Sequence, residues 1–164
     1  MLAARQSRVP ACICISIMTE VVLAYLHLIA ILTMTVFLSA EVALCRPAWM
    51  NAAVVQRLAR VDLIYMGSAL TVLATGLARF ALGAKGWEWY VHNPLFHVKV
   101  TLFVVMLVLS VRPSITLARW RRMQAGTGVL PPAPEVDATR RRMFWTAHLM
   151  LVLPLLGVLL ARGY

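Results

Sequence analysis

Two histidines inside apolar stretches are the side chains of this sequence best suited to ligand chemistry. His27 lies about seven residues into one stretch, about 10 Å from its end if the stretch is helical. His97 is the fourth residue from Pro94, which begins another stretch. A helix N-terminus disfavours the imidazolium, and the neutral ring is the form that ligates metals. Two such rings at comparable depth on different helices are the arrangement that an axially ligated haem requires.

Two cations accompany these histidines. Lys99 follows His97 by two positions, and Arg79 ends a third apolar stretch. In the ligand hypothesis Lys99 pairs with an anion, which is Glu88, Glu20 or a haem propionate, and Arg79 presents its planar guanidinium to a carboxylate. Small and hydroxyl side chains precede Arg79 along one helical stripe: Ser68, Thr71, Thr75 and the neighbouring Gly76. The alternative is structural: each histidine hydrogen-bonds a neighbouring helix, and Lys99 extends its amine to the membrane surface.

The remaining polar side chains of the apolar stretches receive structural interpretations. His148 has no partner at its depth, so we predict that it is structural. Glu41, near the end of its stretch, is expected to form an interfacial ion pair with Arg46, and His92 to be solvated in a loop. Cys12, Cys14 and Cys45 follow no spacing typical of a disulfide framework or a zinc site.

These residues must be positioned by membrane-spanning helices. The 164 residues are 62% hydrophobic and 13% charged, with a mean hydropathy of +0.81, whereas soluble domains carry about 25% charged residues. Four apolar stretches run approximately over residues 21–44, 61–82, 95–111 (or to 118) and 143–160. Crossing about 30 Å of hydrocarbon takes about 17–25 helical residues. The sequence therefore predicts an all-α fold, a four-helix transmembrane bundle in contact with membrane lipid.

The net charge of +10 is concentrated beside the stretches. Ten arginines belong to the first and third connections: Arg46, Arg57, Arg60, Arg112, Arg119, Arg121, Arg122, Arg140, Arg141 and Arg142. Only Arg79, Lys85 and Lys99 surround the second. This asymmetry predicts cytoplasmic arginine-rich loops and both termini outside. We do not expect a nucleic-acid partner, because the charge follows the pattern of membrane topology.

The first 17 residues are treated separately from the rest. They imitate a signal peptide, but lack a long apolar region and a small-residue cleavage site. Since Met18 directly precedes the first stretch, residues 1–17 are interpreted as an over-extended N-terminus, and residues 18–164 as one four-span domain. A real, partly ordered extension is the alternative.

The connections carry their own signals. Asn93-Pro94 predicts an N-cap followed by proline in the first turn of the third span. Residues 83–93 contain Trp87, Trp89 and Tyr90, which are typical of an interfacial aromatic belt. Glycine and proline in residues 124–137 predict a flexible or polyproline loop.

Several motifs resemble a known bacterial membrane family, called domain of unknown function 2214. They are Tyr25-Leu-His27, Thr75-Gly-Leu-Ala-Arg79, Asn93-Pro-Leu-Phe-His97-Val-Lys99 and Arg112-Pro-Ser114 running to Arg119-Trp-Arg121. The resemblance covers nearly all of residues 18–164 and implies a multi-pass protein of the bacterial inner membrane. More distantly, that family resembles the membrane protoporphyrinogen oxidases and the copper-resistance protein D family. In the oxidases an early-span histidine and a His-x-Lys motif are associated with haem b, and the matching positions here are His27, His97 and Lys99.

Three functions are therefore considered. The first is a haem-b-binding or electron-transfer membrane protein with a redox partner, in which His27 and His97 ligate iron and Lys99 and Arg79 hold the propionates. The second is an oxidase of a porphyrinogen-like substrate; the segment after His27 departs from the oxidase pattern. The third is a cofactor-free protein that assists assembly or transport.

Overall fold

The computed structural model describes residues 11–82 and 87–162 and contains no strand within them. Four long helices dominate: α1 (Ala11–Leu44), α2 (Ala52–Leu82), α4 (Pro94–Thr127) and α5 (Ala133–Arg162). A 3-10 helix, η1 (Pro47–Trp49), joins the first two, and the short α3 (Trp87–His92) precedes α4. Each long helix contains a segment long and apolar enough to cross a membrane. The predicted all-α class and the four spans are confirmed.

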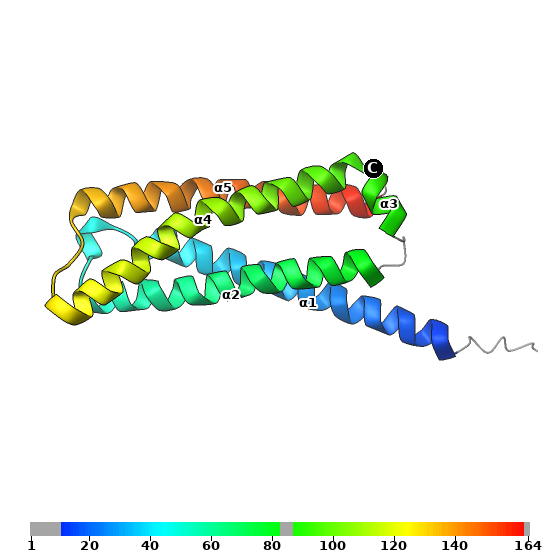
Figure 1. Ribbon diagram of the computed structural model, residues 1–164, viewed down its shortest axis with the longest axis horizontal. Coiled ribbons are helices and arrows are strands. Elements are labelled where there is room, and N and C mark those ends of the chain that lie inside the picture. Colours follow the sequence, from blue (N-terminus) through cyan, green and yellow to red (C-terminus); the bar gives the residue numbers. More distant parts are fainter. Residues whose placement is uncertain (1–10, 83–86, 163–164) are drawn as a thin grey trace, which may run out of the picture.

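The long helices form an up-and-down bundle (Figure 1). α1 packs against α2, α2 against α4, α4 against α5, and α5 against α1. η1 and the α4–α5 connection lie at one end of the bundle, which we call the arginine-rich end. α3, the start of α1 and the end of α5 lie at the other, the α3 end. The two arginine-rich connections therefore lie at the same end of the bundle.

The helices extend beyond the apolar stretches, and one loop prediction was wrong. Residues 124–137 were expected to form a flexible loop, but α4 continues to Thr127 and α5 begins at Ala133. Gly128 ends α4 in the left-handed conformation (φ 70°) and donates its N–H to the Gln124 carbonyl. Pro134 lies in the first turn of α5. Backbone N–H groups in a first turn make no hydrogen bond within the helix, so proline, which lacks an N–H, is tolerated there. Proline therefore marks a helix start here, not a polyproline segment.

The start of α4 was predicted correctly. The Asn93 side chain accepts a hydrogen bond from the backbone N–H of Leu95 at 2.9 Å, and Pro94 is the first helical residue. Phe96 stacks on Phe80 of α2, with ring centroids 5.4 Å apart, and also meets Tyr90 of α3. This aromatic cluster fixes α3 against the ends of α2 and α4.

The bundle buries two apolar clusters and exposes its apolar periphery. One cluster, centred on Met34, Tyr65 and Met106, fills the middle, and another, centred on Leu58 and Trp120, fills the arginine-rich end. Large apolar side chains cover the outside of all four long helices. Such a surface is suited to lipid, since a soluble protein rarely exposes apolar patches of this extent.

Candidate functional site

His27 makes a hydrogen bond between helices at the α3 end of the bundle. Its Nδ1 lies 2.8 Å from Thr75 Oγ1 of α2, and that hydroxyl donates to the Thr71 carbonyl at 2.7 Å. Because the hydroxyl hydrogen is used, Thr75 Oγ1 accepts from Nδ1–H. The neutral ring therefore carries its lone pair on Nε2. Metal-ligating histidines commonly have this arrangement, with the second ring nitrogen held by a hydrogen bond.

Gly76 permits this close approach of α1 and α2. A β-carbon added at Gly76 would lie 3.4 Å from His27 Cε1. The imidazole thus rests against bare backbone. The stripe of small residues noted in the sequence provides the acceptor and the space at two adjacent positions, Thr75 and Gly76.

Two cations from other helices lie within electrostatic range of His27. The charges of Lys99 on α4 and Arg79 on α2 both act on the imidazole, and they act on each other. Lys99 reaches toward α5: its Nζ would lie 3.3 Å from a β-carbon at Gly157. We call His27, Thr75, Arg79 and Lys99 the His27 cluster. Of the four residues proposed from the sequence as a site, it contains three.

The cations have no acidic partner in the part of the chain that the structure describes. The one ion pair found there joins Arg119 to Glu135 at the opposite end of the bundle. The expected pairing of Lys99 with Glu88 or Glu20 is not formed. Arg79 and Lys99 are both partly buried, so their charges are incompletely hydrated. An anion bound beside them would offset part of this cost.

The hydrogen bond that His97 forms is to α3 and not to a residue of the His27 cluster. Its side chain is exposed, and its Nε2 donates to the Val91 carbonyl at 2.6 Å. The ring thus ties the first turn of α4 to α3. In this conformation the neutral ring carries its lone pair on Nδ1, the opposite tautomer to His27.

The other histidines form local contacts. His148 is exposed, and its Nδ1 donates to the Phe144 carbonyl one turn earlier at 2.8 Å. His92 does the same with the Glu88 carbonyl at 2.8 Å. Within residues 11–82 and 87–162, no group of three or more His, Cys, Asp or Glu side chains is placed to hold a metal ion.

A second polar cluster, at the arginine-rich side of the bundle, was missed in the sequence. Glu41 was expected to pair with Arg46, and this was wrong. Its side chain points into the bundle, 1% exposed, and its Oε1 has no hydrogen-bond partner. Arg46 instead stacks its guanidinium over Trp49, 4.8 Å from the ring centroid. Glu41 shares a helical face with Met34 and Leu38, and this periodicity was the available signal for its burial.

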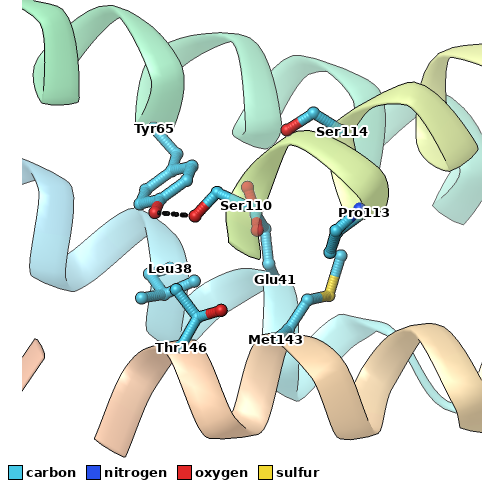
Figure 2. Close-up of a pocket in the computed structure, with 8 residues that line it drawn as sticks. All are labelled: Leu38, Glu41, Tyr65, Ser110, Pro113, Ser114, Met143 and Thr146. Atoms are coloured by element: carbon cyan, nitrogen blue, oxygen red, sulfur yellow. Dashed lines mark hydrogen bonds between the residues drawn. The ribbon is translucent and has the colours of Figure 1, made fainter. Parts of the chain in front are cut away.

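Hydroxyl groups from the other three long helices line the space beside Glu41, and Asp62 lies on the neighbouring α2. Asp62 accepts a hydrogen bond from Ser114 of α4 at 2.6 Å. Tyr65 and Ser110 hydroxyls are 2.6 Å apart, and Ser110 also donates to the Met106 carbonyl. Figure 2 shows the narrow space that they enclose, which we call the Glu41 crevice. Its lining residues are Leu38, Glu41, Tyr65, Ser110, Pro113, Ser114, Met143 and Thr146.

Cys45 lies just beyond α1, one turn from Glu41. It is completely buried, and its thiol donates to the Val136 carbonyl across a 3.7 Å separation. Burial raises the pKa of Cys45 to about 11; Arg140 opposes this effect, while Glu41 and Asp137 add to it. The thiol is therefore neutral and unreactive at physiological pH.

Comparison with known proteins identifies the family of the chain but no individual relative. A family model described as "Predicted membrane protein (DUF2214)" matches residues 19–164. No curated protein and no solved structure matches the chain. The family match covers all four spans and includes every residue of the His27 cluster and the Glu41 crevice.

Proposed function

Because the chain belongs to the DUF2214 family of predicted membrane proteins, we propose that it is a membrane protein that binds an anionic, haem-b-type cofactor at the His27 cluster for electron transfer. One observation carries the proposal: two partly buried cations, which have no acidic partner among the described residues, act on an imidazole whose Nδ1 is held by Thr75, so that Nε2 is the ring nitrogen left to ligate. Haem supplies an iron that accepts such a nitrogen and two propionates that suit such cations.

The residues fit this cofactor in part. Thr75 orients the His27 ring and fixes the tautomer that leaves Nε2 available. Arg79 and Lys99 are suited to hold carboxylates by charge-assisted hydrogen bonds. His97 does not fit as the opposite ligand in its present conformation, because it is exposed and occupied by the Val91 carbonyl. A role for His97 as a ligand requires that this hydrogen bond be exchanged and the ring turned.

The His27–Thr75 hydrogen bond also favours a second function. Hydrogen bonds between membrane helices stabilise bundles without any cofactor, by about 0.6 kcal/mol on average. In a cofactor-free assembly or transport accessory protein, this hydrogen bond would be the whole role of His27. We place this function second because it does not explain why Arg79 and Lys99 lie in the cluster. No specific contact favours the oxidase of a porphyrinogen-like substrate over electron transfer.

An absorption spectrum of the detergent-purified protein, before and after addition of haemin, tests the proposal. We expect a Soret band that shifts on reduction, is lost in His27→Ala, and is weakened in Lys99→Gln and Arg79→Gln. His148→Ala is the matched control, since its exposed ring bonds only its own helix, and it should keep the band. A wild-type protein that gives no Soret band even with added haemin would refute haem binding and leave the accessory function.

The orientation in the bacterial inner membrane is part of the same proposal. The ten arginines of the first and third connections favour a cytoplasmic arginine-rich end, which puts the His27 cluster in the outer leaflet. Reporter fusions in the connection at residues 128–132 and after Arg162 should report opposite sides, with the connection inside. A connection found outside would move the cluster to the inner leaflet.

A further inference from the structure

Glu41 is a carboxyl group buried in the span of α1 with an unused hydrogen-bonding atom. Its side chain is 1% exposed, and its Oε1 meets no donor in the part of the chain that the structure describes. Figure 2 shows the group pointing into the Glu41 crevice, where side chains from all four long helices converge. Buried polar groups are nearly always partnered, so an orphaned carboxyl oxygen indicates an absent ligand.

A second carboxyl group increases the negative charge at this point. The charges of Glu41 and Asp62 act on each other across the α1–α2 interface. Asp62 has a partner, the Ser114 hydroxyl at 2.6 Å; Glu41 has none. Neither forms an ion pair within the described residues. Two carboxylates in an apolar bundle are costly to keep ionised together, so in the resting state a proton or a metal cation should accompany them.

The ionisable groups around Glu41 leave this requirement unmet. Tyr65 of α2 lines the crevice, and the charge of Asp62 on the same helix acts on Glu41. α4 contributes the Ser110 and Ser114 hydroxyls and Pro113, none of which is ionisable. From α5 the lining is Met143 and Thr146. The nearby cation on α5, Arg140, donates its Nε to the Val42 carbonyl at 3.3 Å and acts, with Asp137, on Cys45.

The narrowness of the crevice favours a proton over a metal cation. A hydrated cation would have to widen the space between the lining side chains, whereas a proton adds no volume. A proton needs only an acceptor. The Glu41 carboxylate is itself that acceptor, and its Oε1 is engaged by no other group among the described residues.

We propose that Glu41 is an exchangeable proton-binding site within the membrane. On release the Glu41 O–H bond breaks, the proton passes to water at the arginine-rich end, and one negative charge stays on Glu41. Glu41 lies one helical turn from the end of α1, since its carbonyl accepts the N–H of Cys45 at 2.9 Å. A proton that leaves at this end must pass the apolar cluster centred on Leu58 and Trp120.

This site is separate from the His27 cluster. Glu41 is the fourteenth residue after His27 on α1, about 21 Å along the helix. The apolar cluster that contains Ala30, Met34 and Met106 fills the bundle between them. The proton site thus adds a proton-coupled step to the protein and does not depend on whether a cofactor binds at the other end.

Infrared spectroscopy of the full-length protein in detergent, with exchange into deuterated buffer, tests the proposal. We expect a carboxylic-acid C=O band at neutral pH that shifts on deuteration and is lost in Glu41→Gln. Asp62→Asn should keep the band but titrate at lower pH, because the neighbouring negative charge is gone. Glu135→Gln is the matched control, since Glu135 pairs with Arg119 as a carboxylate, and its carboxylic-acid band should equal that of the wild type.

Three results would overturn the proposal. The first is a wild-type protein with no such band at neutral pH, and the second is a band that survives in Glu41→Gln. The third is loss of the wild-type band on addition of sodium at constant pH, which would assign the site to a metal cation. Helix content by circular dichroism accompanies each variant. If Glu41→Gln does not fold, three measurements still test the proposal. They are the presence of the wild-type band, its response to sodium and the titration of the band in Asp62→Asn.

Discussion

Replacing Thr75 with valine removes the acceptor that holds the His27 ring while keeping the shape of the side chain. The hydrogen bond is 2.8 Å long, and the Thr75 hydroxyl is the side-chain partner of Nδ1. Hydrogen bonds between membrane helices contribute about 0.6 kcal/mol on average and at most about 1.7 kcal/mol. We therefore expect Thr75→Val to lower the free energy of unfolding by about 0.6–1.7 kcal/mol, measured by denaturation in mixed micelles.

Thr71→Val is the matched control for this experiment. Thr71 lies one turn before Thr75, and its hydroxyl bonds only to the Gly67 carbonyl of its own helix. The substitution changes the same atoms without touching α1, so its effect should be smaller. A double-mutant cycle of Thr75→Val with His27→Ala should give a coupling energy of the size of the hydrogen bond.

The same variant separates the two functions proposed for the cluster. If His27 ligates a cofactor, loss of the hydrogen bond to its second ring nitrogen should weaken binding by about 10–100-fold. If His27 only forms a hydrogen bond between α1 and α2, Thr75→Val should change the free energy of unfolding and have no effect on cofactor binding. Equal stabilities of Thr75→Val and Thr71→Val, with no coupling to His27, would refute our account of the interaction.

Three further predictions concern the arginine-rich end. Glu135→Ala should destabilise by about 1–3 kcal/mol because it leaves the indole N–H of the buried Trp120 unpaired, whereas Glu135→Gln keeps an acceptor and should cost less than about 1 kcal/mol in chemical denaturation. Gly128→Ala forces a side chain into a left-handed conformation and should lower thermal stability by about 1–2 kcal/mol, with Gly126→Ala as the helical control. Cys45 should resist alkylation at neutral pH until the protein unfolds; because its folded pKa is raised from 9.0 to about 11, its contribution to stability is complete below pH 9 and is lost as pH rises from 9 to 11. Rapid labelling of the folded protein would contradict the last prediction.

The sequence by itself determined the class of the protein and the order of its parts. Each apolar stretch is about long enough to cross a bilayer as a helix. Helices are then expected, because a single segment in hydrocarbon must satisfy its backbone hydrogen bonds internally. Local signals were also sufficient at the start of α4, where Asn93 and Pro94 act within one turn. They misled in residues 124–137, because the same prolines that suggest a loop are compatible with the first turn of α5.

Only the tertiary structure decided which polar side chains meet. Depth in the membrane follows from position along a helix, and on this basis His27, His97, Arg79 and Lys99 were all expected together. Direction around the helix depends on how the helices are rotated against one another, and packing sets that rotation. It turned His27 toward Thr75 and His97 toward the Val91 carbonyl, and it brought the carboxyls of Glu41 and Asp62, which lie on two different spans, into one electrostatic pair.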